Sequence, residues 1–368
     1  MTTPVLEASA TAQRNGLAER IFKATIDALE LFHLYVGERL GLYRALADLG
    51  SASPAELAAA AGIAERYARE WLEQQAVADV VEVAEDPGGD GARRRYRLPA
   101  GHAEVLLDRD SLSYMAPLAL GATGVARTLP EVLDAFRSGD GVPYEAYGPD
   151  LRDCISLLNR PMFLHQLAGE WLPALPEPHA RLQADPSARV ADVGCGTGWS
   201  SIAIALAYPR AVVHGLDLDE DSIAEARRNA AQAGVADRVT FEVRDAADPG
   251  LAGRYDLVCA FETIHDMADP VAALRAMRAL RAEDGVVLVG DEKVAESFTA
   301  PGDELERLNY GWSALHCLPS GMVQQPSAET GTVMRPATLR RYALQAGFAD
   351  AEVLPIEHDF WRFYGLVG

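Results

Sequence analysis

The chain has 368 residues, of which 49% are hydrophobic and 24% charged, and this composition excludes a disordered or fibrous protein. A formal net charge of −21 opposes binding to nucleic-acid phosphates, so small molecules are the expected partners. The length exceeds that of one typical domain, and we therefore expect two.

The N-terminal stretch MTTPVLEASATAQRNGLAER lacks a basic region followed by an apolar run. We therefore expect no secretory signal and a cytoplasmic protein. No segment reads as a membrane span. The four cysteines, at positions 154, 195, 259 and 317, show no CxxC spacing, which argues against a zinc ribbon or a disulfide framework. They are expected to be reduced and packed.

Residues 1–110 are predicted to form a mostly helical winged-helix domain. Apolar residues at helical spacing continue to Gly50. Ser53 and Pro54 then form the N-cap and first turn of another helix, and Gly62 separates it from the next one. The polar break DPGGDGARR joins VVEVAED to RRYRLP as a hairpin. Helix, turn, helix and hairpin in this order are typical of a winged helix.

Residues 111–175 are predicted to be a helical connector, interrupted by the turn-rich SGDGVPYEAYGPD. This segment is expected to contact a second copy of the chain, so a homodimer is predicted. The proline-rich PALPEPHARLQADPSAR leads into the next unit.

Residues 176–368 alternate between apolar strands and helices, which predicts a parallel sheet covered on both faces. The last two strands, AEVLPIE and FWRFYGLV, are separated by only two residues. A parallel crossover needs a dozen or more, so this closing pair must be antiparallel. The predicted fold is α/β, with a Rossmann-like seven-stranded sheet.

A glycine loop follows the first of these strands. VADVGCGTGWSS places Gly194, Gly196 and Gly198 between a strand and a helix, where glycines permit a tight turn and let a ligand lie against the backbone. A dinucleotide-binding GxGxxG motif would need glycine at position 199, which is Trp199. The mismatch argues against NAD.

Acidic residues close the next two strands. Asp217 ends the second strand, where a carboxylate can accept hydrogen bonds from ribose hydroxyls. Asp245 ends the third and is followed by Ala246, a pair suited to the edge of an adenine. The combination indicates a nucleoside site. The alternative is that these glycines and acids serve only turns and helix caps.

From Arg189 to the C-terminus the chain resembles the class I S-adenosylmethionine (SAM)-dependent methyltransferases, whose acid-then-GxGxG pattern is met by Asp192 and VGCGTG. The resemblance implies SAM as the cofactor. The implied cofactor-binding residues are Asp192, Gly194, Gly196 and Gly198 near the methionine portion, Asp217 at the ribose, Asp245 and Ala246 at the adenine, and Phe261.

TIHDMADPVAALRAMRAL resembles the segment of plant and actinomycete small-molecule O-methyltransferases in which a His-Asp pair follows the fourth strand. In that family the histidine is the base, which implies that His265 is catalytic and that Asp266 orients it. Imidazole is mostly unprotonated at neutral pH, whereas a phenol keeps its proton and needs a base. Met267 stands where the family usually has tryptophan. Alternatively, His265 caps a helix or bonds a backbone carbonyl.

An unusually long insert, residues 296–334, is rich in aromatic, glycine and proline residues, and long irregular segments are often lids or binding loops. Its predicted substrate-binding residues are Tyr310, Trp312, His316 and Met322, with local packing as the alternative. Arg160 is a candidate contact for an acidic substrate, or else a salt-bridge partner.

No metal is predicted, because Glu262 and His316, which could join His265 as ligands, lack close spacing.

The predicted function is SAM-dependent methylation of a small aromatic metabolite, most readily at oxygen. The alternative is a regulator that binds DNA through the winged helix and senses SAM with its second domain. IAERYAREWLEQQ, which would enter the groove, lacks a basic face, and only RRRYR at 93–97 favours DNA.

Overall fold

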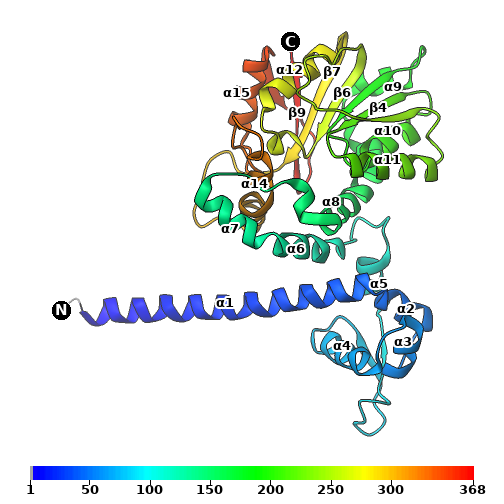
Figure 1. The fold of residues 1–368 in the computed structure, drawn as a ribbon, viewed down its shortest axis with the longest axis vertical. Helices are drawn as coiled ribbons and strands as arrows, with labels where there is room; N and C mark the ends of the chain where they lie inside the picture. Colours follow the sequence, from blue (N-terminus) through cyan, green and yellow to red (C-terminus); the bar gives the residue numbers. More distant parts are fainter. Residues whose placement is uncertain (1–2) are drawn as a thin grey trace. The chain divides into compact units, whose positions relative to one another are not determined.

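The computed structural model describes residues 3–368, with side chains from residue 9 onward. The chain divides into two compact units, residues 1–123 and 124–368 (Figure 1). No helix in the described part of the chain is both long and apolar enough to cross a bilayer. The four cysteines are free and buried, as predicted.

The first unit is mostly helical. It contains α1 (Thr3–Arg39), α2 (Leu42–Leu49), α3 (Pro54–Ala61), α4 (Glu65–Val77), β1 (Glu82–Glu85), β2 (Arg95–Arg97) and α5 (Ala100–Leu107). Ser53 caps α3: its Oγ accepts a hydrogen bond from the Glu56 backbone N–H, and the Glu56 carboxylate accepts one from the Ser53 backbone N–H. β1 and β2 pair antiparallel. The predicted winged-helix order is confirmed.

The arginines of this hairpin are neutralised by nearby carboxylates. The ion pairs are Arg93 with Asp90, Arg94 with Glu73 and Asp86, Arg95 with Glu56, and Arg97 with Glu82. RRRYR therefore does not present a row of unpaired positive charges to a phosphate backbone. The one sequence feature that favoured DNA binding therefore no longer supports it.

The predicted connector is mainly helical. It contains α6 (Pro117–Arg127), α7 (Leu129–Ser138), the 3-10 turn η1 (Tyr144–Tyr147), α8 (Gly148–Met162) and the π-helical η2 (Phe163–Trp171), and α9 (Pro176–Gln183) follows it. From residue 124 onward these elements belong to the second unit.

The second unit is built on a seven-stranded sheet in the order β5-β4-β3-β6-β7-β9-β8. The strands are β3 (Arg189–Val193), β4 (Val212–Asp217), β5 (Val239–Val243), β6 (Tyr255–Phe261), β7 (Arg281–Glu292), β8 (Asp350–Val353) and β9 (Trp361–Val367). Only β9 runs antiparallel to its neighbours β7 and β8. The predicted sheet and its antiparallel closing pair are confirmed.

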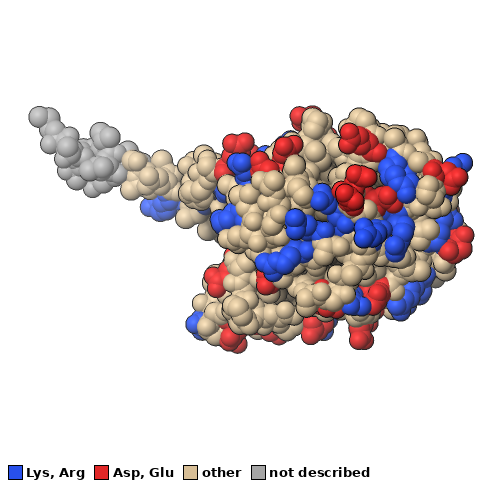
Figure 2. Space-filling view, turned by 90° about the horizontal axis from the view of Figure 1, so that it is seen from above, with Lys and Arg blue, Asp and Glu red and all other residues tan. Residues whose placement is uncertain are grey.

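Helices cover both faces of the sheet (Figure 1). α10 (Trp199–Ala207) and α11 (Glu220–Gln232) bury apolar residues in one core cluster together with η2, and α12 (Pro270–Leu280) and α15 (Pro336–Ala346) bury theirs in another. Strands buried on both faces read as continuous apolar runs, which is why the sequence showed no polar alternation in them. Figure 2 shows positive side chains gathered in a band on one face, with acidic side chains beside it.

The insert is not the irregular lid that its composition suggested. Residues 304–321 form consecutive helical segments, α13 (Glu304–Trp312), the π-helical η4 (Ser313–Cys317) and α14 (Leu318–Gly321). Asp303 starts the first of them, because its carboxylate accepts a hydrogen bond from the Glu306 backbone N–H. Pro319 lies in the first turn of α14 and Gly321 is its last residue, two positions at which a helix tolerates these residue types.

Candidate active site

A cavity of about 630 Å³ in the second unit lies at the carboxyl ends of the central strands. In a parallel sheet, ligands bind at this edge. The wall consists of Tyr144, Glu145, Arg152, Ile155, Ser156, Asn159 and Phe163 from the preceding helical segments, residues 194–197 of the glycine loop, residues 199 and 200 at the start of α10, residues 217–222, residues 261–263, Asp266 and Ser320.

Four of the predicted cofactor residues, Gly194, Gly196, Asp217 and Phe261, line this cavity. Gly196 has φ +51° and open space where a Cβ would be. Asp217 holds it in place: one carboxylate oxygen accepts the Gly196 N–H at 2.8 Å, and the other accepts the Asp219 N–H at 2.9 Å. Burial raises the pKa of Asp217, although these hydrogen bonds oppose the shift.

Asp192 and Gly198 stabilise the glycine loop but do not line the cavity. The Asp192 carboxylate accepts hydrogen bonds from the Ser200 and Ser201 hydroxyls at 2.5 and 2.6 Å. Asp192 is 1% exposed and ties β3 to the first turn of α10. Gly198, with φ +84°, is the N-cap of that helix and packs against Phe241.

Asp245 and Ala246, predicted at the adenine, are not in the wall. The Asp245 carboxylate accepts a hydrogen bond from the Ala247 N–H at 2.8 Å, the geometry of a local turn.

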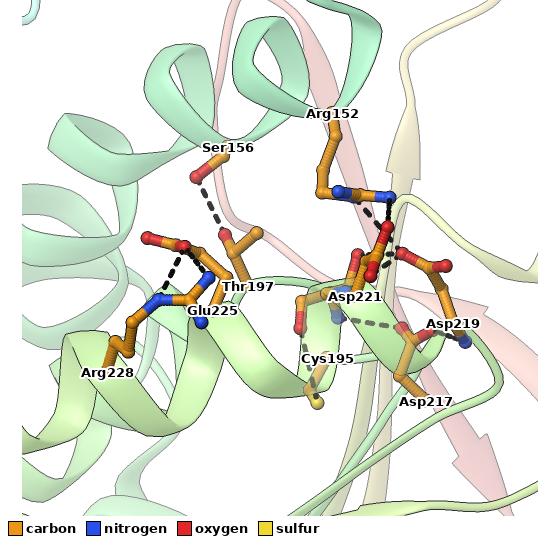
Figure 3. Close-up of polar contacts among 11 residues, drawn as sticks. Arg152, Ser156, Cys195, Thr197, Asp217, Asp219, Asp221, Glu225 and Arg228 are labelled. Carbon is orange, nitrogen blue, oxygen red and sulfur yellow. Dashed lines mark hydrogen bonds and ion pairs between the residues drawn. The ribbon is translucent and has the colours of Figure 1, made fainter. Parts of the chain in front are cut away.

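One face of α8 is tied to the cavity rim, a feature that the sequence analysis missed (Figure 3). Arg152 bonds Asp219 at 3.2 Å and Asp221 at 3.0 Å, at the start of α11. The Ser156 hydroxyl lies 2.7 Å from that of Thr197 in the glycine loop. The spacing of positions 152, 156 and 159 on one helical face was the available signal.

Glu262 is a second wall residue for which the sequence predicted no contact with the cofactor or the substrate. It follows β6 directly and has φ +55°, a left-handed conformation that is uncommon for a residue other than glycine. Its backbone N–H bonds the Gly290 carbonyl at 2.9 Å, and its carboxylate accepts a hydrogen bond from the Asn159 amide. Burial, and then the neighbouring Glu292, raise the pKa of Glu262 to about 8.

His265 lies behind the cavity rather than in its wall. It is 1% exposed, and its Nδ1 lies 2.8 Å from the Asp291 carboxylate and 3.1 Å from that of Glu292. Its Nε2 lies 3.1 Å from Asp266. Asp266 is the member of this group that reaches the cavity.

Three carboxylates set the charge of His265. Burial opposes a charged imidazole, but Asp291, Glu292 and Asp266 together raise the pKa of His265 well above its ordinary value. Burial likewise opposes ionisation of Asp266, yet the pKa of Asp266 is lowered by His265. At neutral pH the pair is therefore an imidazolium and a carboxylate.

Two sets of side chains here offer ligand atoms within 4.8 Å of one another, one formed by His265, Asp291 and Glu292 and the other by His265, Asp266 and Cys317. The His265 Nδ1 to Asp291 distance of 2.8 Å is that of a charge-assisted hydrogen bond. Hydrogen bonding accounts for the contact between His265 and Asp291 in the first set without a metal ion.

None of the predicted substrate residues lines the cavity. His316 is 3% exposed, with its ring 4.7 Å from that of Tyr147, and Trp312 packs beside a separate apolar cluster. Tyr310 is exposed and bonds Arg335. Met322, just after α14, is partly buried, and the Arg160 guanidinium stacks 4.5 Å from the Trp199 ring.

Comparisons with known proteins agree with this architecture. Residues 184–330 match a family model described as a methyltransferase domain, and residues 28–108 match one described as an Rv2258c-like winged HTH domain.

Among curated proteins, the 27-O-demethylrifamycin SV methyltransferase of Amycolatopsis mediterranei is 37% identical over 105 residues, 28% of this chain and 38% of that protein. The ubiquinone biosynthesis O-methyltransferase of Bordetella bronchiseptica is 38% identical over 175 residues, 46% of this chain and 66% of that protein. The chain thus spans well under half of the first of these relatives and about two thirds of the second.

Among solved structures, the mitomycin 7-O-methyltransferase MmcR has a TM-score of 0.67 at 19% identity, with 97% of this chain and 99% of that chain covered. PigF, solved with S-adenosylhomocysteine (SAH), has a TM-score of 0.67 at 19% identity, with 95% and 99% covered. NcsB1, in complex with SAM and a hydroxynaphthoic acid, has a TM-score of 0.60 at 20% identity, with 92% and 96% covered. At these identities the likeness establishes a shared fold over nearly the whole chain.

Proposed function

We infer that this chain is a SAM-dependent methyltransferase that acts on a small molecule, because a class I methyltransferase domain follows an Rv2258c-like winged helix-turn-helix domain in the sequence. The acceptor is a small aromatic metabolite, and the methyl group goes to oxygen. Among the structural neighbours, the O-methyltransferase NcsB1, solved with a hydroxynaphthoic acid, supports an aromatic acceptor, and MmcR, a 7-O-methyltransferase, supports oxygen as the methylated atom.

The observation that carries the proposal is the pairing of Gly196 with Asp217. The glycine loop leaves open space at the Gly196 Cα, and the carboxylate that holds this loop lies in the same wall. A nucleoside lying against the loop brings its ribose to Asp217, which accepts hydrogen bonds from hydroxyls. Gly194 and Phe261 complete the wall on the side of the methionine portion.

In the proposed reaction the acceptor oxygen attacks the methyl carbon, a C–O bond forms, and the C–S bond breaks to leave neutral SAH. Alignment of the two groups lowers the barrier by about 7–11 kcal/mol. The hydroxyl proton goes to the Asp266 carboxylate and not to His265, the base predicted from the sequence, because His265 is already an imidazolium. Asp266 meets the acceptor because it lines the cavity, and His265 holds Asp266 in position from behind.

The proposed assembly is a cytoplasmic homodimer whose chains have a winged-helix domain at 1–110, a helical connector at 111–175 and a methyltransferase domain at 176–368. Exposed apolar side chains along α1 support self-association, with Ile21 58%, Phe22 70% and Leu29 53% exposed. Analytical ultracentrifugation of the purified protein tests this, and a monomer at all concentrations contradicts it.

Isothermal titration of the protein with SAM and SAH tests the cofactor assignment, and a methylation assay on a panel of phenols tests the acceptor class. We expect binding of both nucleosides and transfer to at least one phenol. No heat with either nucleoside excludes the proposed activity.

A further inference from the structure

We propose that Glu262 binds a cationic amino group inside the cavity. The inference rests on the proposed function, because it assumes that this cavity holds the cofactor and the acceptor. The amino group belongs either to the amino-acid end of the cofactor or to the acceptor, and both present the same chemistry to a carboxylate.

Glu262 is placed beside the glycine loop by strand pairing. β3 and β6 are parallel neighbours, with Asp192 opposite Cys259, so the turn after β6 adjoins the loop after β3. A Cβ on Gly194 would lie 2.3 Å from the Thr263 hydroxyl, which shows how closely the two turns approach. The Glu262 carboxylate therefore enters the cavity at the end where the loop begins.

The backbone of Glu262 indicates that its side chain has a role. Glycine or asparagine adopts positive φ most easily, yet a glutamate occupies this position with φ +55°. The Gly290 carbonyl and the Asn159 amide hold the residue from two directions. Strained residues of this kind cluster at ligand sites.

The cavity wall around Glu262 contains little positive charge, and the His265 imidazolium behind it is already shared by Asp266, Asp291 and Glu292. The wall contains seven acidic residues and one basic one, Arg152, which is already bonded to two of these carboxylates. The seven acids are Glu145, Asp217, Asp219, Glu220, Asp221, Glu262 and Asp266. Behind Glu262, the Asp291 Oδ2 atom is buried without a hydrogen-bond partner, and the Glu292 Oε2 atom has only the ion contact with His265. A cation in the cavity would offset this excess of carboxyl groups.

Aromatic rings complete a site for an ammonium group. Phe163 and Phe261 both line the cavity, with ring centroids 5.6 Å apart. Aromatic faces attract cations, and a carboxylate beside them supplies hydrogen-bond acceptors.

Arrival of a cation should expel a proton. Burial and Glu292 raise the pKa of Glu262 to about 8, so its carboxyl holds a proton at neutral pH in the empty cavity. An ammonium ion stabilises the ionised form and lowers this pKa. His265 and Glu292 are the titratable groups that face Glu262 from the neighbouring elements, and Asn159 faces it from α8.

The cofactor arm of the test compares SAH with its deamino analogue, which keeps the carboxylate. Each is titrated into wild type, Glu262→Gln and Glu352→Gln, the last an exposed acid on β8 outside the cavity wall. If the amino group is the cofactor's, Glu262→Gln weakens SAH by about 10-fold or more and leaves the analogue unchanged. Glu352→Gln changes neither.

The acceptor arm uses the SAH-loaded protein and two phenols that differ in their tails, tyramine and 3-(4-hydroxyphenyl)propionate. If the amino group is the acceptor's, wild type prefers tyramine, and Glu262→Gln abolishes the preference. Titration in two buffers of different ionisation enthalpy should reveal proton release in wild type and none in the variant.

A selective loss in either arm supports the proposal and identifies the source of the amino group. Unchanged selectivity in both arms overturns it while the proposed function stands. Failure of wild type to bind SAH at all removes the proposed function and the inference together. Glu262→Asn, which tolerates positive φ and shortens the side chain, provides a second variant if Glu262→Gln does not fold.

Discussion

Asp217, at the end of β4, accepts the backbone N–H of Gly196 at 2.8 Å and so joins the second strand of the nucleotide-binding half to its glycine loop. Asp217→Ala removes this bond and the proposed ribose contact. Loss of hydrogen bonds to a charged group weakens binding by about 10- to 100-fold. Isothermal titration with SAH measures the effect. Asp217→Asn, which keeps one acceptor oxygen, should lose less, and an unchanged dissociation constant in Asp217→Ala would refute the assignment.

Two glycines of the same loop should respond differently to alanine. Gly196 and Gly198 both have positive φ, which costs alanine about 1–2 kcal/mol. A Cβ at Gly196 meets nothing within 4 Å, whereas one at Gly198 lies 2.6 Å from the Phe241 ring. Overpacking adds about 1–3 kcal/mol at Gly198.

Gly198→Ala should therefore lower the melting temperature more than Gly196→Ala does. Gly196→Ala should instead reduce SAH affinity, because its methyl group points into open space beside the cavity wall. Thermal denaturation and titration of both variants check this. The interpretation of the loop is wrong if Gly196→Ala binds SAH normally.

The sequence was sufficient for the fold because the decisive signals were local. Only residues 354–360 separate β8 from β9, too few for a parallel crossover. Gly194 and Gly196 follow directly after β3, and Asp217 ends β4. The site was only partly predictable. His265 bonds Asp291, which comes 26 residues later in the chain, and does not line the cavity. The order of residues in the sequence does not reveal this contact.

Segments distant in sequence account for the remaining differences. Arg152 and Asn159 reach the cavity from α8, 67 and 103 residues before their partners Asp219 and Glu262. The predicted substrate residues of the insert fold into helical segments, which turns His316 toward Tyr147 instead of the cavity. Such placements arise from tertiary packing.

Arg152→Ala should loosen the cavity rim without unfolding the protein (Figure 3). The ion pairs with Asp219 and Asp221 are partly exposed and contribute at most about 1 kcal/mol to stability. We expect SAH to dissociate roughly 3- to 10-fold faster, with little change in melting temperature. Arg228→Ala, which removes an ion pair with Glu225 within α11, is the matched control. Equal dissociation rates in the two variants would count against a rim contact.

The paired arginines of the β1–β2 hairpin predict weak DNA binding. Because carboxylates neutralise Arg94, Arg95 and Arg97, the counterion release that drives binding to duplexes should be small. A gel shift with random duplex DNA at physiological salt should show no complex. A tight complex would favour the regulator over the enzyme.

His265→Ala should reduce turnover by about 10²- to 10⁴-fold and leave SAH affinity nearly intact, because His265 supports Asp266 and does not touch the cofactor wall. It also leaves Asp291, 1% exposed, without its partner, and this costs about 3–5 kcal/mol of stability. His265→Gln keeps a hydrogen-bond donor and serves as the control for structure. Normal turnover in His265→Ala would assign His265 a packing role only.

The stability change should depend on pH. Asp291, Glu292 and Asp266 face His265 and raise its pKa in the folded state against the effect of burial. The group therefore contributes its full stability below its ordinary pKa of about 6.5, and this contribution disappears as the pH rises through the higher folded-state pKa. The gap in melting temperature between wild type and His265→Gln should be wide at pH 6 and should narrow in alkaline buffer. A gap that widens with pH would mean that His265 is neutral in the folded protein. The assignment of an imidazolium beside Asp266 would then be wrong.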